Sequence, residues 1–399
     1  MNRRHFIRVA GGGIVAGVTA GALTGCGLSG DFPAAAIEAW QGPGSQPDLR
    51  RWALRHAILA PSSHNRQPWM VDLAEPDAIT LYVDRSRMLP MTDPWFRQIV
   101  VSHGTFLEAL TLALRELGVA PQVQLFPKGE FKPREVDERP VARISWLPAG
   151  SPGAPAVAPD RLFAQLLRRH TAKVDYDKTK SVALDTLVQL KAALTDPQVT
   201  WGATVEKAAV ERLRRLCWES AKVELLTPRT VMESIQLTRV GPAEIAQYRD
   251  GISVNALVPR LAAAVGAFDR SSPPAEGSTA YGQMMSRFEG HSNTAMGFVW
   301  LSTPTALHRQ QQTTRSAEVN AGRAYMRLQL KATELGLQIH PMSQAPQEFV
   351  EMKPYFDALH TLLVGKPASE ETVQMFCRVG YCADQQHTPR RAVAGFVKT

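Results

Sequence analysis

Apolar residues recur along the chain at two different intervals, which predict a mixture of helices and strands. Residues 97–117 and 319–335 repeat apolar side chains every three or four positions, which predicts two long amphipathic helices ending at Gly118 and Gly336. Shorter helices are predicted over residues 49–59, 160–169, 183–195 and 205–224, and strands over 69–73, 79–83, 123–126, 141–144 and 375–381. The pattern therefore predicts an α+β protein.

The two long helices are similar to one another in sequence. Residues 104–119 align without a gap with residues 322–337, at a constant offset of 218. Any two amphipathic helices share some leucines, but both of these also end in Glu-Leu-Gly followed by an apolar residue. We therefore expect two tandem related halves, each a mixed sheet flanked by helices, that form an intramolecular dimer.

Composition shifts predict the boundaries of these halves. Residues 27–48 and 148–159 are rich in Gly, Pro and Ala, which is typical of linkers. The first half is then expected over 49–147 and the second over 160–399. Residues 227–293 show little periodicity and are too long for a plain loop, so we expect a partly helical lid or insertion there.

The stretch Pro61-Ser62-Ser63-His64-Asn65-Arg66-Gln67-Pro68-Trp69 connects a predicted helix to a predicted strand. Its prolines fix the backbone and remove two N–H donors, so we expect a rigid turn. The hydroxyl and carboxamide groups between the prolines suit a planar ligand with alternating donors and acceptors. Local bonding of Ser and Asn at a helix end explains the same residues equally well.

Composition describes a soluble globular protein long enough for two domains. The chain has 399 residues, 44% of them hydrophobic and 21% charged, with a formal charge of +8. Basic residues are mixed with acidic ones and are not interleaved with aromatic residues, so we expect no nucleic-acid binding. An anionic small ligand is compatible with this charge.

The N-terminus resembles a targeting sequence. Arg3-Arg4 followed by Phe6-Ile7 and a Gly/Ala/Val-rich stretch is similar to a twin-arginine signal. Leu23-Thr24-Gly25-Cys26 is similar to a lipobox, in which Cys26 would carry the lipid. Residues 1–26 therefore predict export by the twin-arginine route, to the periplasm or to a lipid anchor on the outer side of a bacterial membrane. The alternative is an N-terminal segment that is basic but carries no targeting signal, in which the two arginines are adjacent by chance.

The remaining cysteines and two basic runs bear on candidate chemistry. Cys217, Cys377 and Cys382 have no metal-ligand spacing, so we expect free thiols and no metal site. Arg169-His170-Thr171-Ala172-Lys173 offers a guanidinium fork, a hydroxyl and a cation that suit a phosphate. Thr388-Pro389-Arg390-Arg391 offers a second anion site. The alternative for the first run is a solvated basic helix end. The alternative for the second run is a charged C-terminal tail.

Taken in order, these motifs resemble the FMN-dependent nitroreductases. The resemblance rests on the Pro-Ser-Ser turn, the Arg-His-Thr-x-Lys run, the turn at residues 336–344, and Gly380-Tyr381 with the C-terminal basic pair. It extends over residues 49–393 and fits the Acg-like branch, in which the two halves of the usual homodimer are fused. Asp93-Pro94-Trp95-Phe96-Arg97 is similar to an element of that branch.

The resemblance implies an FMN site at the interface of the two halves. It implies that Arg169, Thr171 and Arg391 hold the phosphate, with Arg390 a further candidate, while His170 and Lys173 lie toward the ribityl chain and the N1–O2 edge of the ring. The other implied contacts come from the first-half turn and from the turn after the second long helix: Pro61, Ser62, Ser63, Asn65, Gln67, Pro341, Met342 and Ser343.

Each half lacks the motif that the other retains. No Arg-x-Ser-x-Arg run precedes the first-half turn, and Thr195-Asp196-Pro197-Gln198 stands where the second half would repeat the Pro-Ser-Ser turn. We therefore expect one FMN per chain, in a monomeric pseudo-dimer.

The family activity implies a flavoprotein that reduces a nitroaromatic, a quinone or a similar small acceptor. The electron donor is open, because cytoplasmic NAD(P)H does not reach an exported protein, and no side chain stands out as catalytic. Two alternatives remain: a protein that binds or sequesters FMN with little turnover, and a scaffold that binds no flavin.

Overall fold

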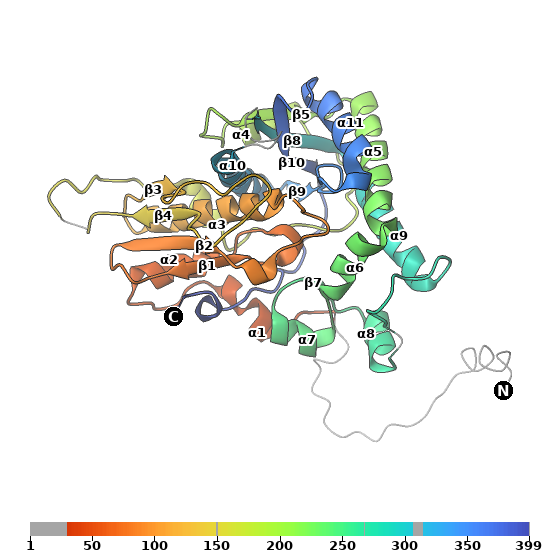
Figure 1. The fold of residues 1–399 in the computed structure, drawn as a ribbon, viewed down its shortest axis with the longest axis horizontal. Helices are drawn as coiled ribbons and strands as arrows, with labels where there is room; N and C mark the ends of the chain where they lie inside the picture. The colour runs from red at the N-terminus through yellow and green to blue at the C-terminus, as the bar shows by residue number, and fades with distance from the viewer. Residues whose placement is uncertain (1–29, 149–150, 267, 306–313, 399) are drawn as a thin grey trace, which may run out of the picture.

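The structure is a computed structural model that describes residues 30–148, 151–266, 268–305 and 314–398 (Figure 1). The predicted signal, residues 1–26 with Cys26, lies outside the described residues. No helix within the described ranges combines the length and the apolar character needed to cross a bilayer.

The first half is a four-stranded sheet packed on helices. Its helices are α2 (Leu49–Ala57) and α3 (Arg97–Glu116), and its strands are β1 (Trp69–Asp72), β2 (Ala78–Val83), β3 (Gln122–Leu125) and β4 (Ala142–Ser145). The strand order is β1-β2-β4-β3, with every neighbouring pair antiparallel. Residues 396–398 return from the C-terminus and join the outer edge of β1 through a parallel bridge between Val71 and Val397.

The second half repeats this arrangement. Its elements are α4 (Leu184–Lys191), β5 (Thr200–Thr204), β8 (Gly297–Pro304), α10 (Arg315–Glu334), β9 (Gln338–Pro341), α11 (Lys353–Val364) and β10 (Glu371–Gly380). The strand order β5-β8-β10-β9 matches that of the first half strand for strand, with α10 in the place of α3. The prediction of two tandem related α+β halves is confirmed.

The matching helices α3 and α10 pack against one another at the matching glycines. A Cβ added to Gly104 would lie 2.0 Å from the carbonyl oxygen of Val319, and one added to Gly322 would lie 2.0 Å from that of Val101. Positions 101 and 319 are separated by the same 218 residues as the two glycines. The contact is therefore reciprocal, as at a two-fold dimer interface, but it lies within one chain.

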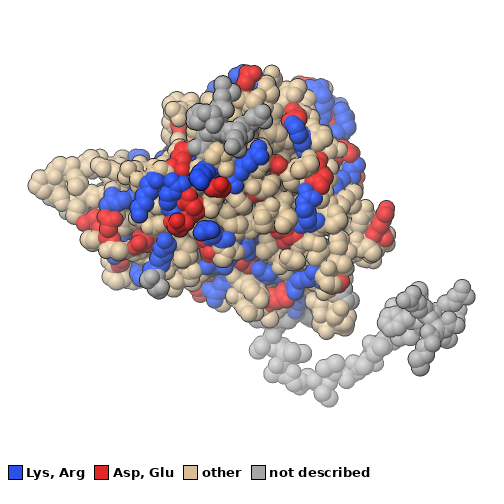
Figure 2. Space-filling view, in the orientation of Figure 1, with Lys and Arg blue, Asp and Glu red and all other residues tan. Residues whose placement is uncertain are grey.

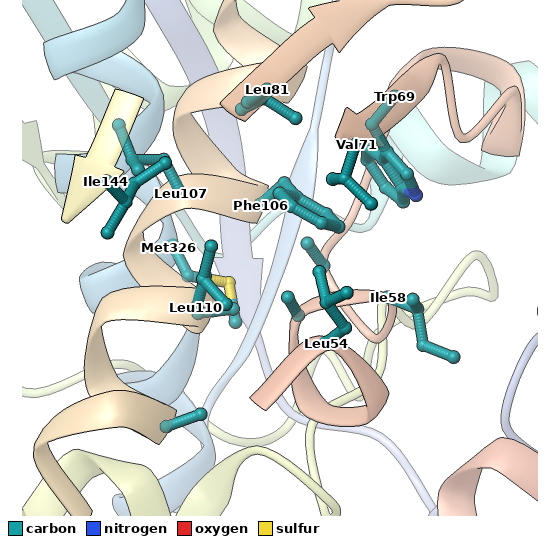
Figure 3. Close-up of a cluster of buried hydrophobic side chains, with 14 of the residues drawn as sticks. Leu54, Ile58, Trp69, Val71, Leu81, Phe106, Leu107, Leu110, Ile144 and Met326 are labelled. Carbon is teal, nitrogen blue, oxygen red and sulfur yellow. The ribbon is translucent and has the colours of Figure 1, made fainter. Parts of the chain in front are cut away.

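The hydrophobic core of the first half continues across this contact. Phe106 and Leu110 of α3 pack between the strands and α2, and Met326 of α10 belongs to the same buried cluster (Figure 3). A second cluster lies between α10 and the sheet of the second half, and includes Leu328, Val299 and Val379.

The connection between the first two strands distinguishes the halves. In the first half it is residues 73–77, whereas in the second it is residues 205–296, with two short parallel strands among its helices. These elements are α5 (Lys207–Leu226), α6 (Pro228–Gln236), β6 (Thr238–Val240), α7 (Gly241–Tyr248), β7 (Ile252–Val254), α8 (Leu257–Ala264) and α9 (Thr279–Asn293). We call this connection the insertion.

Two local expectations differ from the structure. The helix expected over 160–169 is only a 3-10 helix, η4 (Arg161–Gln165), because Leu162 and Leu166 are buried and the chain then turns to bring Arg169 inside. The stretch expected to be a tether contains α1 (Ala34–Ile37) and the 3-10 helix η1 (Glu38–Gln41). Trp40 anchors them, since its ring is buried and its Nε1 donates to the carbonyl of Thr388 at 2.8 Å.

Candidate ligand-binding site between the two halves

The Pro61–Trp69 turn, which the sequence predicts to be rigid, has an unusual backbone conformation. His64, Asn65 and Gln67 all have positive φ, at 47°, 51° and 49°. Such conformations cost about 1–3 kcal/mol each in a residue other than glycine, so the surroundings must impose them. Ser62 contributes, because its hydroxyl accepts from the Gln67 N–H at 2.9 Å.

The turn is bound by the C-terminal segment, which crosses over from the second half. Asn65 Oδ1 accepts from Arg390 Nη1 at 3.0 Å, and Asn65 Nδ2 donates to the carbonyl of Pro389 at 3.1 Å. Gln67 is fully buried, and its Oε1 accepts from the Arg391 N–H at 2.8 Å. Both carboxamides therefore bind protein groups here, and any contact of theirs with a ligand remains a prediction.

Arg169 and Arg390 meet beneath the turn. Each donates from Nη2 to the carbonyl of Leu59, at 3.1 Å and 3.2 Å, and each guanidinium lies over the ring of Trp40, at 5.6 Å and 5.0 Å. Only 1% of Arg169 and 2% of Arg390 is exposed. Within the described residues neither has a carboxylate partner, and the Nε of each is buried without an acceptor.

The electrostatics of this pair are unfavourable without a ligand. Burial lowers the pKa of Arg169 to about 10, and burial together with Arg169 lowers the pKa of Arg390 well below its ordinary value. A buried charge without a partner is costly, and these are two of the same sign. The pair therefore forms a site that an anion would stabilise.

Thr171, His170 and His387 border the arginine pair. Thr171 Oγ1 accepts from Arg169 Nη1 at 3.4 Å. The His170 and His387 rings lie 6.2 Å apart, and the Nε2 atom of each is buried without a partner. Thr171 and His170 are themselves only half-buried, so they form the accessible edge of the pair.

Arg391 has a different environment from Arg390. Its guanidinium donates to the carbonyls of Gln67 at 3.3 Å and Gly395 at 2.5 Å, and lies 3.8 Å from Asp84. Although the resemblance put Arg391 before Arg390 as a phosphate ligand, Arg390 is the one that the structure places beside Arg169. The alternation of side chains along an extended segment separates two adjacent arginines in this way.

Lys173 extends the positive charge toward the insertion. Its side chain is solvent-accessible, yet the surrounding protein, Arg287 of α9 and Arg390 lower its pKa to about 8. Arg287 is also accessible, and the protein packed around it lowers its pKa as well. Neither has an ion pair within the described residues. The neighbouring His64 stays neutral, since burial, Lys173 and Arg66 lower its pKa to about 4.

The Pro341–Ser343 motif lies close to the first-half turn. Gln98 of α3 connects the two, since its Oε1 accepts from the Ser63 hydroxyl at 3.0 Å and its Nε2 donates to the carbonyl of Ser343 at 3.5 Å. Met342 is buried, and its N–H donates to the carbonyl of Phe376 at 2.8 Å. The structure thus brings the four predicted motif groups to one region between the halves.

The Asp93–Arg97 element positions the start of α3. The carboxylate of Asp93 accepts from the N–H groups of Gln98 and Ile99, at 3.2 Å and 2.9 Å. Arg97 is buried in an ion pair with Glu348 of the second half. The element therefore caps the helix and ties the halves together.

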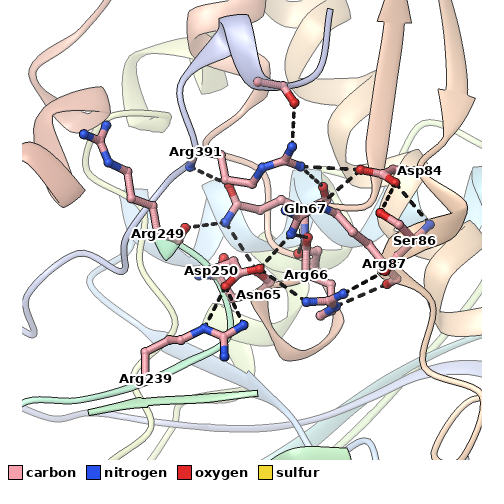
Figure 4. Close-up of polar contacts among 12 residues, drawn as sticks. Asn65, Arg66, Gln67, Asp84, Ser86, Arg87, Arg239, Arg249, Asp250 and Arg391 are labelled. Atoms are coloured by element: carbon pink, nitrogen blue, oxygen red, sulfur yellow. Dashed lines mark hydrogen bonds and ion pairs between the residues drawn. The ribbon is translucent and has the colours of Figure 1, made fainter. Parts of the chain in front are cut away.

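The insertion is attached to the turn by hydrogen bonds and by a buried carboxylate. Gln67 Nε2 donates to the Arg249 carbonyl at 2.8 Å, and the Gly251 N–H donates to the Asn65 carbonyl at 3.3 Å. Asp250 accepts from Arg87 at 2.7 Å, Arg239 at 3.0 Å and Arg66 at 3.3 Å, and only 3% of it is exposed (Figure 4). A further attachment is the hydrogen bond between His64 Nε2 and the Ser234 hydroxyl, at 3.0 Å. The insertion therefore lies against the same turn that borders the arginine pair.

The face of the molecule in Figure 2 carries both signs of charge. On the face in Figure 2, Lys and Arg are interspersed with Asp and Glu over the folded body.

Three residues of this region were not predicted. Trp40 could have been found as a large aromatic residue in a stretch otherwise rich in small residues. Arg378 could have been found as a lone charge within the apolar run 373–379, since such residues are seldom buried without a role. Arg287 has no signal in the sequence, because only the fold brings α9 beside Lys173.

The candidate site thus lies at the interface of two tandem halves and, within the described residues, has an unpaired positive charge, and known proteins resemble parts of the chain in sequence. No family model matches the chain. It is 34% identical over 102 residues to Acg of Mycobacterium tuberculosis, covering 26% of this chain and 29% of Acg. It is 32% identical over 145 residues to PigM of a Serratia strain, covering 33% of this chain and 37% of PigM. Both relatives carry the name NAD(P)H nitroreductase.

Among solved structures, a nitroreductase-type protein from Anabaena variabilis is 11% identical, covering 87% of this chain and 91% of that chain with a TM-score of 0.39. An overlap of this size is too weak to argue from. The sequence matches span about a third of the length of the curated relatives. They show that part of this chain is similar in sequence to proteins named nitroreductases.

Proposed function

We propose that the chain binds one FMN between its halves and acts as an exported flavin-dependent oxidoreductase that reduces a nitroaromatic, a quinone or a similar small acceptor. The observation that carries the proposal is the buried pair Arg169 and Arg390, which has no carboxylate partner within the described residues and retains two unpartnered Nε–H groups. The nitroreductase names of Acg and PigM support the reaction class.

The residues present fit a phosphate monoester. A dianion would offset the like charge of the two arginines, and the Thr171 hydroxyl and the His170 imidazole supply uncharged groups at the accessible edge. Arg390 contributes a contact in place of the one expected of Arg391.

Bound FMN would supply hydride and electron transfer. The protein would orient the FMN and stabilise the negative charge on it. Lys173 is an accessible cation surrounded by protein, where it stabilises negative charge more strongly than in water. The turn holds the C-terminal segment in place, and through it Arg390.

The absorption spectrum of the purified protein tests the cofactor. We expect a flavin spectrum with one FMN per chain. Replacing Arg169→Ala together with Thr171→Ala should release the flavin, whereas the exposed neighbour Arg168→Ala should not, since Arg168 bonds only to Gln165 and Ala is tolerated there. Full retention of FMN by the double variant would show that the phosphate lies elsewhere.

A second function, FMN binding with little turnover, is favoured by the attachment of the insertion to the turn through Asp250 and Ser234. Photoreduced protein mixed with a nitroaromatic or a quinone separates the two functions. Rapid reoxidation without oxygen supports the oxidoreductase, and a flavin that stays reduced supports storage. Protein that carries no flavin and takes up none would point to a scaffold.

Export is a separate part of the proposal and is supported by the Arg3-Arg4 motif and the lipobox-like Cys26. Replacing Arg3-Arg4 with Lys-Lys should retain the protein in the cytoplasm, as cell fractionation would report. Normal export of that variant would contradict the twin-arginine assignment. An exported enzyme would need a quinol, a membrane reductase or a periplasmic partner as its reductant.

A further inference from the structure

Arg378 lies within β10 and is completely buried, with all of its donor nitrogens engaged. Its acceptors lie on three separate parts of the second half: His340 Nδ1 at 3.0 Å, the His291 carbonyl at 2.9 Å, Thr294 Oγ1 at 3.2 Å, the Val174 carbonyl at 2.7 Å and the Ala172 carbonyl at 3.4 Å. One side chain thus fixes the backbone on both sides of Lys173, the end of α9 and the ring of His340.

The bond from Arg378 determines the tautomer of His340. A guanidinium can only donate, so Nδ1 of His340 must accept and the proton of the neutral ring resides on Nε2. Burial and the positive charges of Arg378, His291, Lys173 and Arg287 hold the pKa of His340 well below its ordinary value. With Nδ1 accepting from Arg378, the neutral ring presents an N–H donor at Nε2.

This Nε2–H has no acceptor among the described residues, and it is not sealed from solvent. His340 directly precedes the Pro341–Ser343 motif. Its ring lies 5.1 Å from that of His291, whose Nε2 bonds to the carbonyl of Lys173 at 3.0 Å. The free donor therefore stands at the Lys173 end of the site, apart from the arginine pair.

We propose that His340 is a neutral hydrogen-bond donor to the ring portion of the flavin, and that Arg378 is the residue that positions it. The inference rests on the proposed function and deepens it, because it assigns the end of the site opposite the phosphate. The two ends can be tested separately with FMN and with riboflavin, which has the same ring and no phosphate.

The experiment measures the affinity of flavin-free full-length protein for each ligand by flavin fluorescence. His340→Ala should weaken FMN and riboflavin by the same factor of about ten, the size typical of a lost hydrogen bond. Arg169→Ala should weaken FMN alone. His340→Gln, which retains an N–H donor, should recover part of the affinity for both ligands.

His360→Ala is the matched control, because His360 is also a buried second-half histidine but both of its nitrogens bond to backbone, at Phe356 and Val373. The His360→Ala variant should bind FMN and riboflavin with the same affinities as the wild type. Its unfolding midpoint verifies that it is folded. Nitrogen NMR of the wild-type histidines adds a readout that needs no variant, and should show a neutral Nε2–H form of His340.

The outcomes distinguish the two proposals. Wild-type protein that binds neither ligand overturns the proposed function. Wild-type binding with an unchanged His340→Ala variant, or a His340 ring protonated on Nδ1, overturns the inference alone. A His340→Ala variant that weakens FMN but not riboflavin would place His340 at the phosphate end and also overturn it.

Discussion

The two halves share one strand order, yet they differ at the connections on either side of their first strand. Before that strand, the first half has the rigid Pro61–Trp69 turn, whereas the second has residues 192–199, where Asp196 makes only a local bond to Gln198. After it, the first half has residues 73–77 and the second has the insertion over 205–296. The strand order of the two halves is therefore symmetric, whereas the connections that border the candidate site are not.

The largest effect is expected from breaking the contact that makes the halves equivalent. Gly104→Ala would place a Cβ 2.0 Å from the Val319 carbonyl oxygen, and a backbone atom in a packed helix cannot move aside as a side chain can. We expect the free energy of unfolding to fall by about 4 kcal/mol or more. Denaturant titration measures it.

Gly282→Ala is the matched helical control, because nothing lies within 4 Å of the added Cβ. It should leave stability unchanged or raise it by about 1 kcal/mol. Equal effects of the two substitutions would mean that α3 and α10 do not approach so closely.

The next largest effect concerns the insertion, which only the second half has. Asp250→Asn removes the charge that Arg66, Arg87 and Arg239 share, and leaves three largely buried arginines without it. We expect a loss of about 3 kcal/mol and faster amide hydrogen exchange in residues 238–254. Asp269→Asn, at an exposed position in the insertion with local Ser bonds, should be close to neutral. Unchanged exchange in Asp250→Asn would show that other contacts hold the insertion.

A third test compares the two connections before the first strand. Asn65→Ala removes two hydrogen bonds that link the turn to the C-terminal segment, while Arg390 Nη1 keeps its bonds to the Thr388 hydroxyl and the Pro389 carbonyl. The loss should cost about 1–2 kcal/mol and about tenfold in FMN affinity. The corresponding Asp196→Ala should change stability by less than about 0.5 kcal/mol and leave FMN affinity unchanged. If both variants bind FMN equally, the asymmetry between the connections has no bearing on the ligand.

The smallest effect is a pH dependence from Lys173. The pKa of Lys173 is lowered to about 8 by the surrounding protein, Arg287 and Arg390, and a bound anion would favour its charged form. Binding should then take up a proton above pH 8, so FMN affinity should fall as pH rises from about 8 to 10. Below pH 8 Lys173 is already charged and the affinity should be flat. Lys173→Arg should reduce the slope, and an unchanged slope would assign the dependence to another group.

The repeated scaffold could be predicted from the sequence because it follows from local periodicity. Two long helices with the same Glu-Leu-Gly end were enough to predict the tandem halves, and the helix stops at Gly118 and Gly336 have the expected positive φ. The rigid turn was predictable for the same reason, since two prolines act on their own neighbours.

What could not be predicted depends on contacts between distant residues. Trp40 lies in a stretch with the composition of a linker, and only the return of the C-terminal segment gives it a place to pack. Whether Arg390 or Arg391 lies beside Arg169 depends on which of the two side chains faces inward. A shift of the extended segment by one residue would exchange them, and the sequence does not determine that register. The resemblance could name the motifs but not the orientation of each side chain.

The close contact at Gly104 and Gly322 has a consequence for how such a protein changes over time. In a homodimer every substitution occurs twice, once on each side of the axis, so a change that improves one site also alters the other. Here a substitution occurs only once in each molecule. Because the two halves belong to one chain, their contact also does not weaken when the protein is diluted. One half could therefore lose its turn and gain an insertion while the other kept the partner surface constant.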